Sequence, residues 1–210
     1  MEIRWLEIAD PSDVWRELGF GVDEAGSCVV NGVEHRLVGS DGDRRGVLGW
    51  GVTGIDGSVA DIDGIPTTVV GDPRPEGPAE HPNGVFRIDH LVVRTSDTPR
   101  TMAALASLGL GARGGRTTNS AGTEVDMRFA WAGDTLLEMA GPPTPATEPR
   151  PAKLTGIAYA TNDLEATAAL LGDRSTTPID AVQPGRRIAA LTAAAGSSVP
   201  IAFMTPHPKS

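Results

Sequence analysis

The residues best suited to chemistry in this sequence are His90 and Glu138, each of which lies within a largely apolar run. His90 lies within GVFRIDHLVV (84–93), and Glu138 lies within TLLEMAG (135–141). A carboxylate is costly to bury unless it is paired, protonated or bound to a metal, and a neighbouring imidazole would satisfy it without a metal. The pair could therefore act as base and acid, or bind a metal together. The alternative is a histidine that is hydrogen-bonded in the core and has only a structural role.

Three arginines and one tryptophan are the candidate ligand-binding residues. Arg186 and Arg187 follow Gly185 at the start of a predicted strand, where alternation directs one side chain into a cavity and the other away from it. An inward arginine would bind a carboxylate or phosphate through bidentate hydrogen bonds. Arg128 and Trp131, in VDMRFAWAG, are further candidates, and a tryptophan beside a ligand would favour a flat molecule. The alternatives are surface ion pairs for the arginines and a core position for the tryptophan.

Two proline-rich segments divide the sequence. They are GDPRPEGPAEHPNG (71–84) and GPPTPATEPRPAK (141–153), and they separate the blocks 1–70, 85–141 and 154–206. Neither segment contains enough apolar residues to join a packed element, so both are predicted to be extended linkers.

The second and third blocks repeat one order of elements. In the second, the strand-like run FRIDHLVV precedes a helix N-cap at Ser96 or Asp97 and the helical run TMAALASLGLGA. In the third, LTGIAYA precedes Asp163 and the helical run LEATAALLGD, and Asp163 lies 66 positions after Asp97. Strand-like runs follow both helices. The sequence therefore predicts an α+β fold with a duplicated β-α-β-β-β module.

The first block has the same pattern in a shortened form, with the strand IRWLEIA and the helix VWRELGF. We predict an N-terminal extension of one or more shortened modules over 1–72 and a two-module domain over 85–206. The modules of that domain span 85–141 and 154–206.

Strand alternation determines where the two chemical residues point. Ile88, His90 and Val92 are predicted to share one face of their strand, while Leu91 and Val93 point the other way. If those leucine and valine side chains pack under the helix, the imidazole points into the opposite hollow, where Glu138 of the last strand can face it.

Paired modules with a histidine on the first strand and a glutamate on the last resemble the vicinal oxygen chelate superfamily, which includes glyoxalase I, bleomycin-resistance proteins and extradiol dioxygenases. The residues that carry the resemblance are RIDHLVVRTSDTPRTMAALASLGL, DTLLEMAGPP, LTGIAYATNDLEATAALLGD and GRRIAALTAAAGSSVPIAFM, within about 85–206. The resemblance implies that the strands curl into a cupped, barrel-like sheet whose concave surface holds a divalent metal.

The resemblance also implies a ligand set. His90 and Glu138 match the first pair of metal ligands, whereas the second pair falls on Gly156 and Phe203, neither of which can bind a metal. A divalent metal would then lack the three or four protein ligands of a catalytic site. The cup is therefore expected to hold either a metal completed by other residues or an organic ligand without a metal, and Phe203 is expected to line it.

We expect from this resemblance a glyoxalase-like protein whose cup binds a small organic molecule, with metal-assisted lyase or dioxygenase chemistry on vicinal oxygens if it is an enzyme. The alternative is a non-catalytic binding protein of the bleomycin-resistance type. A third possibility is a structural module that pairs as a homodimer.

Composition restricts the partners further. The net charge of −9 comes with no block of lysine or arginine, which disfavours nucleic acids and anionic membranes as partners. The first twenty residues are too highly charged for a secretory signal, and no apolar run is long enough to span a membrane, so we expect a cytoplasmic protein. Cys28 is the single cysteine and cannot form an internal disulfide.

Overall fold

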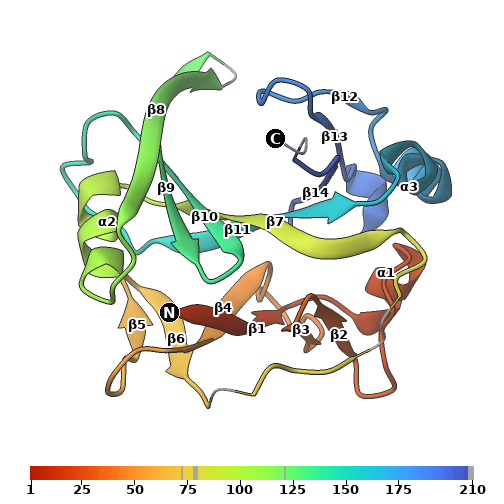
Figure 1. Cartoon of the computed structure of the whole chain (residues 1–210), viewed down its shortest axis with the longest axis horizontal. Helices are drawn as coiled ribbons and strands as arrows, with labels where there is room; N and C mark the ends of the chain where they lie inside the picture. The colour runs from red at the N-terminus through yellow and green to blue at the C-terminus, as the bar shows by residue number, and fades with distance from the viewer. Residues whose placement is uncertain (72, 78–79, 121, 208–210) are drawn as a thin grey trace.

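The chain folds into two β-sheets that pack face to face (Figure 1). The computed structural model describes residues 1–71, 73–77, 80–120 and 122–207. Within these residues, the larger sheet has the strand order β12-β13-β14-β11-β7-β10-β9-β8 and the smaller sheet has the order β2-β3-β1-β4-β6-β5. The fold class is α+β, as the sequence predicts.

The larger sheet consists of two β-α-β-β-β modules. The first contains β7 (Val85–Arg94), α2 (Thr98–Ala106), β8 (Ala112–Ser120), β9 (Thr123–Ala132) and β10 (Thr135–Gly141). The second contains β11 (Lys153–Thr161), α3 (Leu164–Leu171), β12 (Ile179–Asp180), β13 (Arg187–Ala190) and β14 (Ile201–Met204). In each module the last strand runs parallel to the first, and β7 and β11 pair antiparallel at the centre of the sheet.

Equivalent aspartates start the two helices. Asp97 accepts a hydrogen bond from the Arg100 backbone N–H at 2.9 Å, and Asp163 accepts one from the Ala166 backbone N–H at 3.0 Å. Each carboxylate satisfies an N–H group that would otherwise lack a partner in the first helical turn. The predicted equivalence of these two residues is confirmed.

The larger sheet bends away from the smaller one at both ends (Figure 1). We call these ends the β8–β9 arm and the β12–β13 arm. Helix α2 contacts β9 and β10 outside the first arm, and α3 contacts β13 and β14 outside the second. The sequence pattern does not indicate where β8 lies, because Gly114 and Gly115 interrupt any strand-like run there.

The strands of the smaller sheet are paired in the same arrangement as those of the larger sheet, with fewer elements. Its elements are β1 (Glu2–Ile8), α1 (Ser12–Glu17), β2 (Ser27–Val30), β3 (Val33–Leu37), β4 (Val47–Thr53), β5 (Asp61–Ile62) and β6 (Ile65–Val69). Strand β3 is parallel to β1, β6 is parallel to β4, and β1 and β4 pair antiparallel in the middle. The predicted boundary at residue 72 lies outside the described residues.

The segment before β7 is anchored rather than free. His81 Nδ1 accepts a hydrogen bond from the Gly21 backbone N–H at 2.9 Å, and the Asn83 amide donates to the Leu18 carbonyl at 2.9 Å. Both side chains are buried. The end of the predicted linker 71–84 therefore attaches β7 to the N-terminal sheet.

An aromatic cluster fills the core between the two sheets. Trp15 and Phe20 lie 4.7 Å apart between ring centroids, Phe20 and Tyr159 lie 5.1 Å apart, and Phe203 completes the cluster at 6.3 Å from Tyr159. The ring of His35 lies 5.5 Å from Trp15. This core covers the face of the larger sheet that points toward the smaller sheet. The opposite face of the larger sheet therefore remains available for a ligand.

His35 makes the stability of this core depend on pH. Burial lowers the pKa of its imidazole to about 4, although hydrogen bonds to the Val33 and Cys28 carbonyls oppose the shift. Because an unfolded histidine takes up a proton near pH 6.5, the unfolded state binds the proton first as the pH falls. We expect the free energy of unfolding to fall by about 3 kcal/mol between pH 6.5 and 4 from this residue.

Urea unfolding of the wild type and of His35→Gln at pH 7 and pH 4.5 would measure this contribution. The pKa of His81 is also lowered by burial and acts in the same direction, so the difference between the two proteins isolates His35. Equal pH dependence in both would contradict the prediction.

Candidate functional site

The concave face of the larger sheet contains a cavity of about 880 Å³ between the two arms. The central strands contribute His90, Arg94, Glu138 and Ala140. The β8–β9 arm contributes mostly polar residues, which include Arg116, Thr118, Asn119 and Glu124, and the opposite arm contributes mostly apolar ones, which include Ile179, Val182 and Ile188. A cavity of this size suits a small organic ligand. We call it the cup.

A β-bulge determines how His90 is presented to the cup. In the pairing of β7 with β11, His90 lies opposite Ala158 and Ile88 lies opposite Tyr159, so Asp89 is an extra residue. Such a residue shifts the alternation of the strand. Ile88 is therefore buried in the core between the sheets, and the prediction that it shares a face with His90 is wrong. Asp89 and His90 instead lie side by side.

Asp89 is held in a buried ion pair. Its Oδ1 accepts a hydrogen bond from Arg186 Nη2 at 2.7 Å, and its Oδ2 lies 3.2 Å from Arg186 Nη1 and 3.0 Å from His90 Nδ1. Burial raises the pKa of the Asp89 carboxyl, but the hydrogen bonds from His90 and Arg186 and the charge of Arg186 outweigh it. The net pKa is well below the usual range, so Asp89 is ionised.

Glu138 lines the same cavity as His90 and comes from β10, whose residue Leu136 pairs with His90. Burial raises the pKa of its carboxyl, while His90 when protonated and the charge of Arg116 lower it and Asp89 raises it again. The structure therefore brings together the two residues that the sequence singles out for acid–base chemistry.

Arg116 is a cup residue that was not among the residues predicted from the sequence. It lies on β8, lines the cavity, and its Nε is buried without a hydrogen-bond partner. Among the described residues it makes no hydrogen bond or ion pair, and its guanidinium lies 5.8 Å from the centre of the Phe129 ring. The sequence offers one signal for this position. Arg116 and Thr118 are two residues apart, so on a strand they share a face, and both line the cup.

Arg186, which immediately precedes β13, and Arg187, its first residue, point in opposite directions, as alternation predicts. Arg186 is only 2% exposed, and Asp89 and the Thr205 carbonyl occupy its guanidinium, so it supports the site without lining the cup. Arg187 points outward and pairs with Glu165 of α3. Neither residue is placed to bind a ligand directly, which corrects the prediction for both.

Arg128 and Trp131 also lie outside the cup. Arg128 forms an ion pair with Asp126 at 3.0 Å, on the face of β9 opposite to that of Met127, which lines the cavity. Trp131 shares the face of Met127 but lies further along the strand, is 45% exposed and does not line the cavity. The ligand-binding role predicted for these two residues is not supported by their positions.

The pairing register identifies the position equivalent to His90 in the second module. His90 pairs with Ala158, and Val92 pairs with Gly156, across the antiparallel centre of the sheet. The symmetry of this pairing makes Gly156 the equivalent of His90, in agreement with the count along the sequence.

The equivalent of Glu138 is Ala202 and not Phe203. Glu138 pairs with Val92, and Ala158, the equivalent of Val92, pairs with Ala202. Phe203 lies on the opposite face of β14, fully buried in the aromatic core, so the prediction that it lines the cup is wrong. A shift of one residue reverses the face of a strand.

The donor set of the cup does not fit a divalent metal. His90 and Glu138 supply two ligands, and the equivalent positions in the second module, Gly156 and Ala202, supply none. Across the described part of the chain, no group of three or more His, Cys, Asp or Glu side chains is arranged to hold a metal ion. A cationic arginine also lies beside Glu138, where it would oppose a metal.

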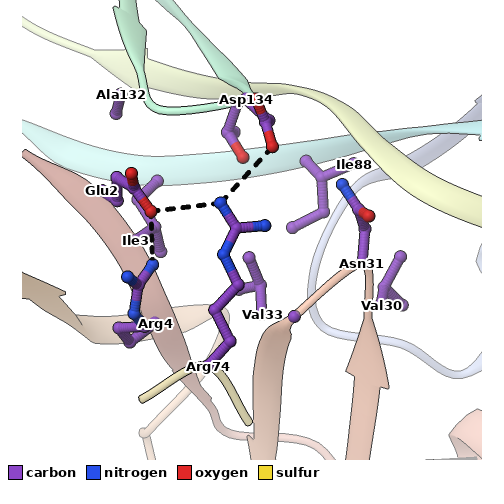
Figure 2. A pocket seen from close by; sticks show the side chains of 12 residues that line it. Glu2, Ile3, Arg4, Val30, Asn31, Val33, Arg74, Ile88, Ala132 and Asp134 are labelled. Carbon is purple, nitrogen blue, oxygen red and sulfur yellow. Dashed lines mark hydrogen bonds and ion pairs between the residues drawn. The ribbon is translucent and has the colours of Figure 1, made fainter. Parts of the chain in front are cut away.

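A second, much smaller cavity of about 20 Å³ lies beside β1, and its charged side chains pair with one another among apolar neighbours (Figure 2). Arg74 lies between Glu2 and Asp134, with Nη2 3.2 Å from Glu2 Oε2 and 3.5 Å from Asp134 Oδ2. Glu2 also contacts Arg4 at 2.7 Å. The space holds about one water molecule, so this cluster joins the two sheets and is not a ligand site.

Comparison with known proteins gives fold matches and no sequence match. No protein-family model and no curated protein matches the sequence. The whole chain aligns with a solved xylose isomerase-like TIM barrel/4-hydroxyphenylpyruvate dioxygenase fusion protein, at a TM-score of 0.61 and 10% identity, and spans 49% of that protein.

Two methylmalonyl-CoA epimerases align with part of the chain. That from Mycobacterium tuberculosis covers 60% of this chain and 91% of its own, at a TM-score of 0.47 and 15% identity. That from Streptomyces coelicolor covers 59% of this chain and 99% of its own, at a TM-score of 0.45 and 21% identity. No helix in the described residues is long and apolar enough to cross a membrane.

Proposed function

We propose that this chain, which has the fold of the vicinal oxygen chelate superfamily, binds a small amphipathic organic anion in the cup without a metal. The observation that carries the proposal is Arg116, whose buried Nε has no partner while the side chain lines a cavity of about 880 Å³. The proposal corresponds to the binding type of protein in this superfamily and not to its metalloenzymes.

The guanidinium of Arg116 indicates an anionic ligand group. A buried polar group without a hydrogen bond loses the free energy of its hydration, and a ligand that restores the bond gains it back. A planar guanidinium matches a carboxylate or phosphate with two parallel hydrogen bonds. Arg116 is near enough to Glu138 to lower the pKa of its carboxyl, but the two side chains do not form an ion pair.

The opposite arm indicates an apolar ligand body. Ile179 and Val182 are 63% and 72% exposed and line the cup together with Ile188 and Met204. Exposed aliphatic side chains gathered at a cavity mark a surface that gains stability when it is covered. A ligand with an anionic group at Arg116 and an apolar chain along the β12–β13 arm would satisfy both sides.

Titrations with octanoate and with octanamide, its uncharged counterpart, test this proposal by calorimetry. We expect octanoate to bind at least about tenfold more tightly than octanamide, because a charge-assisted hydrogen bond contributes about 1.5–3 kcal/mol. Arg116→Gln should abolish that preference. Arg128→Gln is the matched control, because Arg128 lies on the other face of the neighbouring strand, and it should retain the preference.

Equal affinity of the wild type for octanoate and octanamide would contradict the anionic part of the proposal. Binding of neither compound, with a titration of phenyl phosphate that is also negative, would contradict the cup as an anion site.

A second candidate function is proton transfer on the bound ligand. It is favoured by the arrangement of His90, which is oriented by Asp89 and shares the cup with the carboxyl of Glu138. A pair of groups that can accept and donate protons in one cavity is the minimum requirement for general acid–base catalysis. His90 would be the base and Glu138 the acid, with no metal-dependent step.

A further inference from the structure

We infer that Asp89, held by Arg186, is a positioning residue that keeps the proton of neutral His90 on Nδ1 and directs the lone pair of Nε2 into the cup. The inference rests on the proposed function for what Nε2 meets there, namely a hydrogen-bond donor on the bound anion. The orientation itself exists before any ligand binds.

The geometry of the triad supports a fixed orientation. Asp89 Oδ2 lies 3.0 Å from His90 Nδ1, and both carboxylate oxygens contact the guanidinium of Arg186, at 2.7 and 3.2 Å. Arg186 in turn donates to the Thr205 carbonyl at 2.7 and 2.9 Å. Asp89 and Arg186 are both buried, so neither can rotate away without exposing a charge to the apolar interior.

The ionised carboxylate determines the tautomer. A carboxylate oxygen without a proton can only accept, so the hydrogen bond to Asp89 requires that Nδ1 of His90 carry the hydrogen. In the neutral imidazole the other nitrogen is then an acceptor. Among the described residues Nε2 makes no hydrogen bond, and the side chain lines the cavity. The acceptor is therefore available to a ligand.

This arrangement narrows the class of ligand. The cup offers a charged donor at Arg116 for an anionic group and an acceptor at His90 for a hydroxyl or another acidic hydrogen. An anion that carries a hydroxyl group, such as a hydroxy acid with an apolar chain, satisfies both.

The tautomer can be read directly from the ¹⁵N signals of the imidazole rings. Protein with ¹⁵N-labelled histidine, without ligand and at a pH where imidazoles are neutral, would be studied by long-range ¹H–¹⁵N correlation. His90→Gln identifies the His90 signals among those of the four histidines. We expect the Nδ1–H form to exceed the Nε2–H form by roughly tenfold or more in the wild type, as a charge-assisted hydrogen bond allows.

Variants show whether Asp89 is the cause. In the double variant Asp89→Leu/Arg186→Met, which replaces the buried pair by apolar side chains and so should fold, the excess of the Nδ1–H form should be lost. The control is Asp126→Ala, which removes a buried carboxylate that pairs with Arg128 away from the cup and should leave the His90 signals unchanged.

A wild-type His90 with Nε2–H as the major form would overturn the inference, and so would an unchanged tautomer ratio in the double variant. The wild-type spectrum decides the first point even if the variants do not fold. Because the spectra are recorded without ligand, they are independent of the octanoate titration that tests the proposed function.

Discussion

Replacing Arg186 by methionine is expected to lower the free energy of unfolding by about 3–5 kcal/mol, because it leaves the Asp89 carboxylate buried without its counter-charge. Arg186 is the main cationic partner of Asp89, with two contacts at 2.7 and 3.2 Å in the interior, whereas Arg87 lies 3.7 Å away. Urea unfolding followed by circular dichroism would measure the loss. The double variant Asp89→Leu/Arg186→Met should recover most of it, since the buried carboxylate is removed together with its main counter-charge.

Arg187→Met is the matched control for this experiment. The two arginines are adjacent on the chain, but Arg187 forms an exposed ion pair with Glu165, and such pairs contribute about 0–1 kcal/mol. Similar losses of unfolding free energy for Arg186→Met and Arg187→Met would contradict the prediction that Arg186 compensates a buried charge on Asp89.

Truncation of Phe203 to alanine should cost about 3–5 kcal/mol of unfolding free energy while leaving the affinity of the cup for octanoate unchanged within about twofold. The ring is fully buried and packs on Phe20 and Tyr159 between the two sheets, on the face of β14 that points away from the cup. Removal of the ring leaves a space that the surrounding rings cannot fill by small movements. Chemical denaturation and calorimetry on the folded protein would measure the two quantities.

Met204→Ala gives the opposite-face comparison on the same strand. Met204 lines the cup, so its truncation should weaken octanoate binding by removing apolar contact with the ligand chain. If Phe203→Ala weakened binding as much as Met204→Ala, the assignment of the two faces of β14 would be wrong.

Much of the secondary structure could be predicted from the sequence, because the signals that specify it are local. The caps at Asp97 and Asp163 each lie before an apolar helical run, and their hydrogen bonds are made within one helical turn. Alternation likewise explains why His90 and Glu138 reach one cavity, since the core side of each strand is marked by residues such as Leu91 and Met139. The vicinal oxygen chelate resemblance followed from the order of these elements.

The missing parts depend on pairing between strands, which a single sequence does not display. The bulge at Asp89 is defined only by its register with β11, so the sequence indicated neither the burial of Ile88 in the core nor the partner of Asp89. The offset between Glu138 and its equivalent was misjudged by one residue for the same reason. Arg116 was missed because glycines and polar residues concealed the strand that carries it.

The extra residue in β7 has an equivalent in β11. In the register of the two central strands, Thr155 of β11 is skipped just as Asp89 of β7 is, and the two lie 66 positions apart, the same interval that separates the helix caps. What distinguishes the two halves is side-chain identity on a common scaffold: one half displays an acid followed by an imidazole, and the other displays Thr155 followed by Gly156. The two halves therefore share one backbone irregularity and differ in the side chains that it presents.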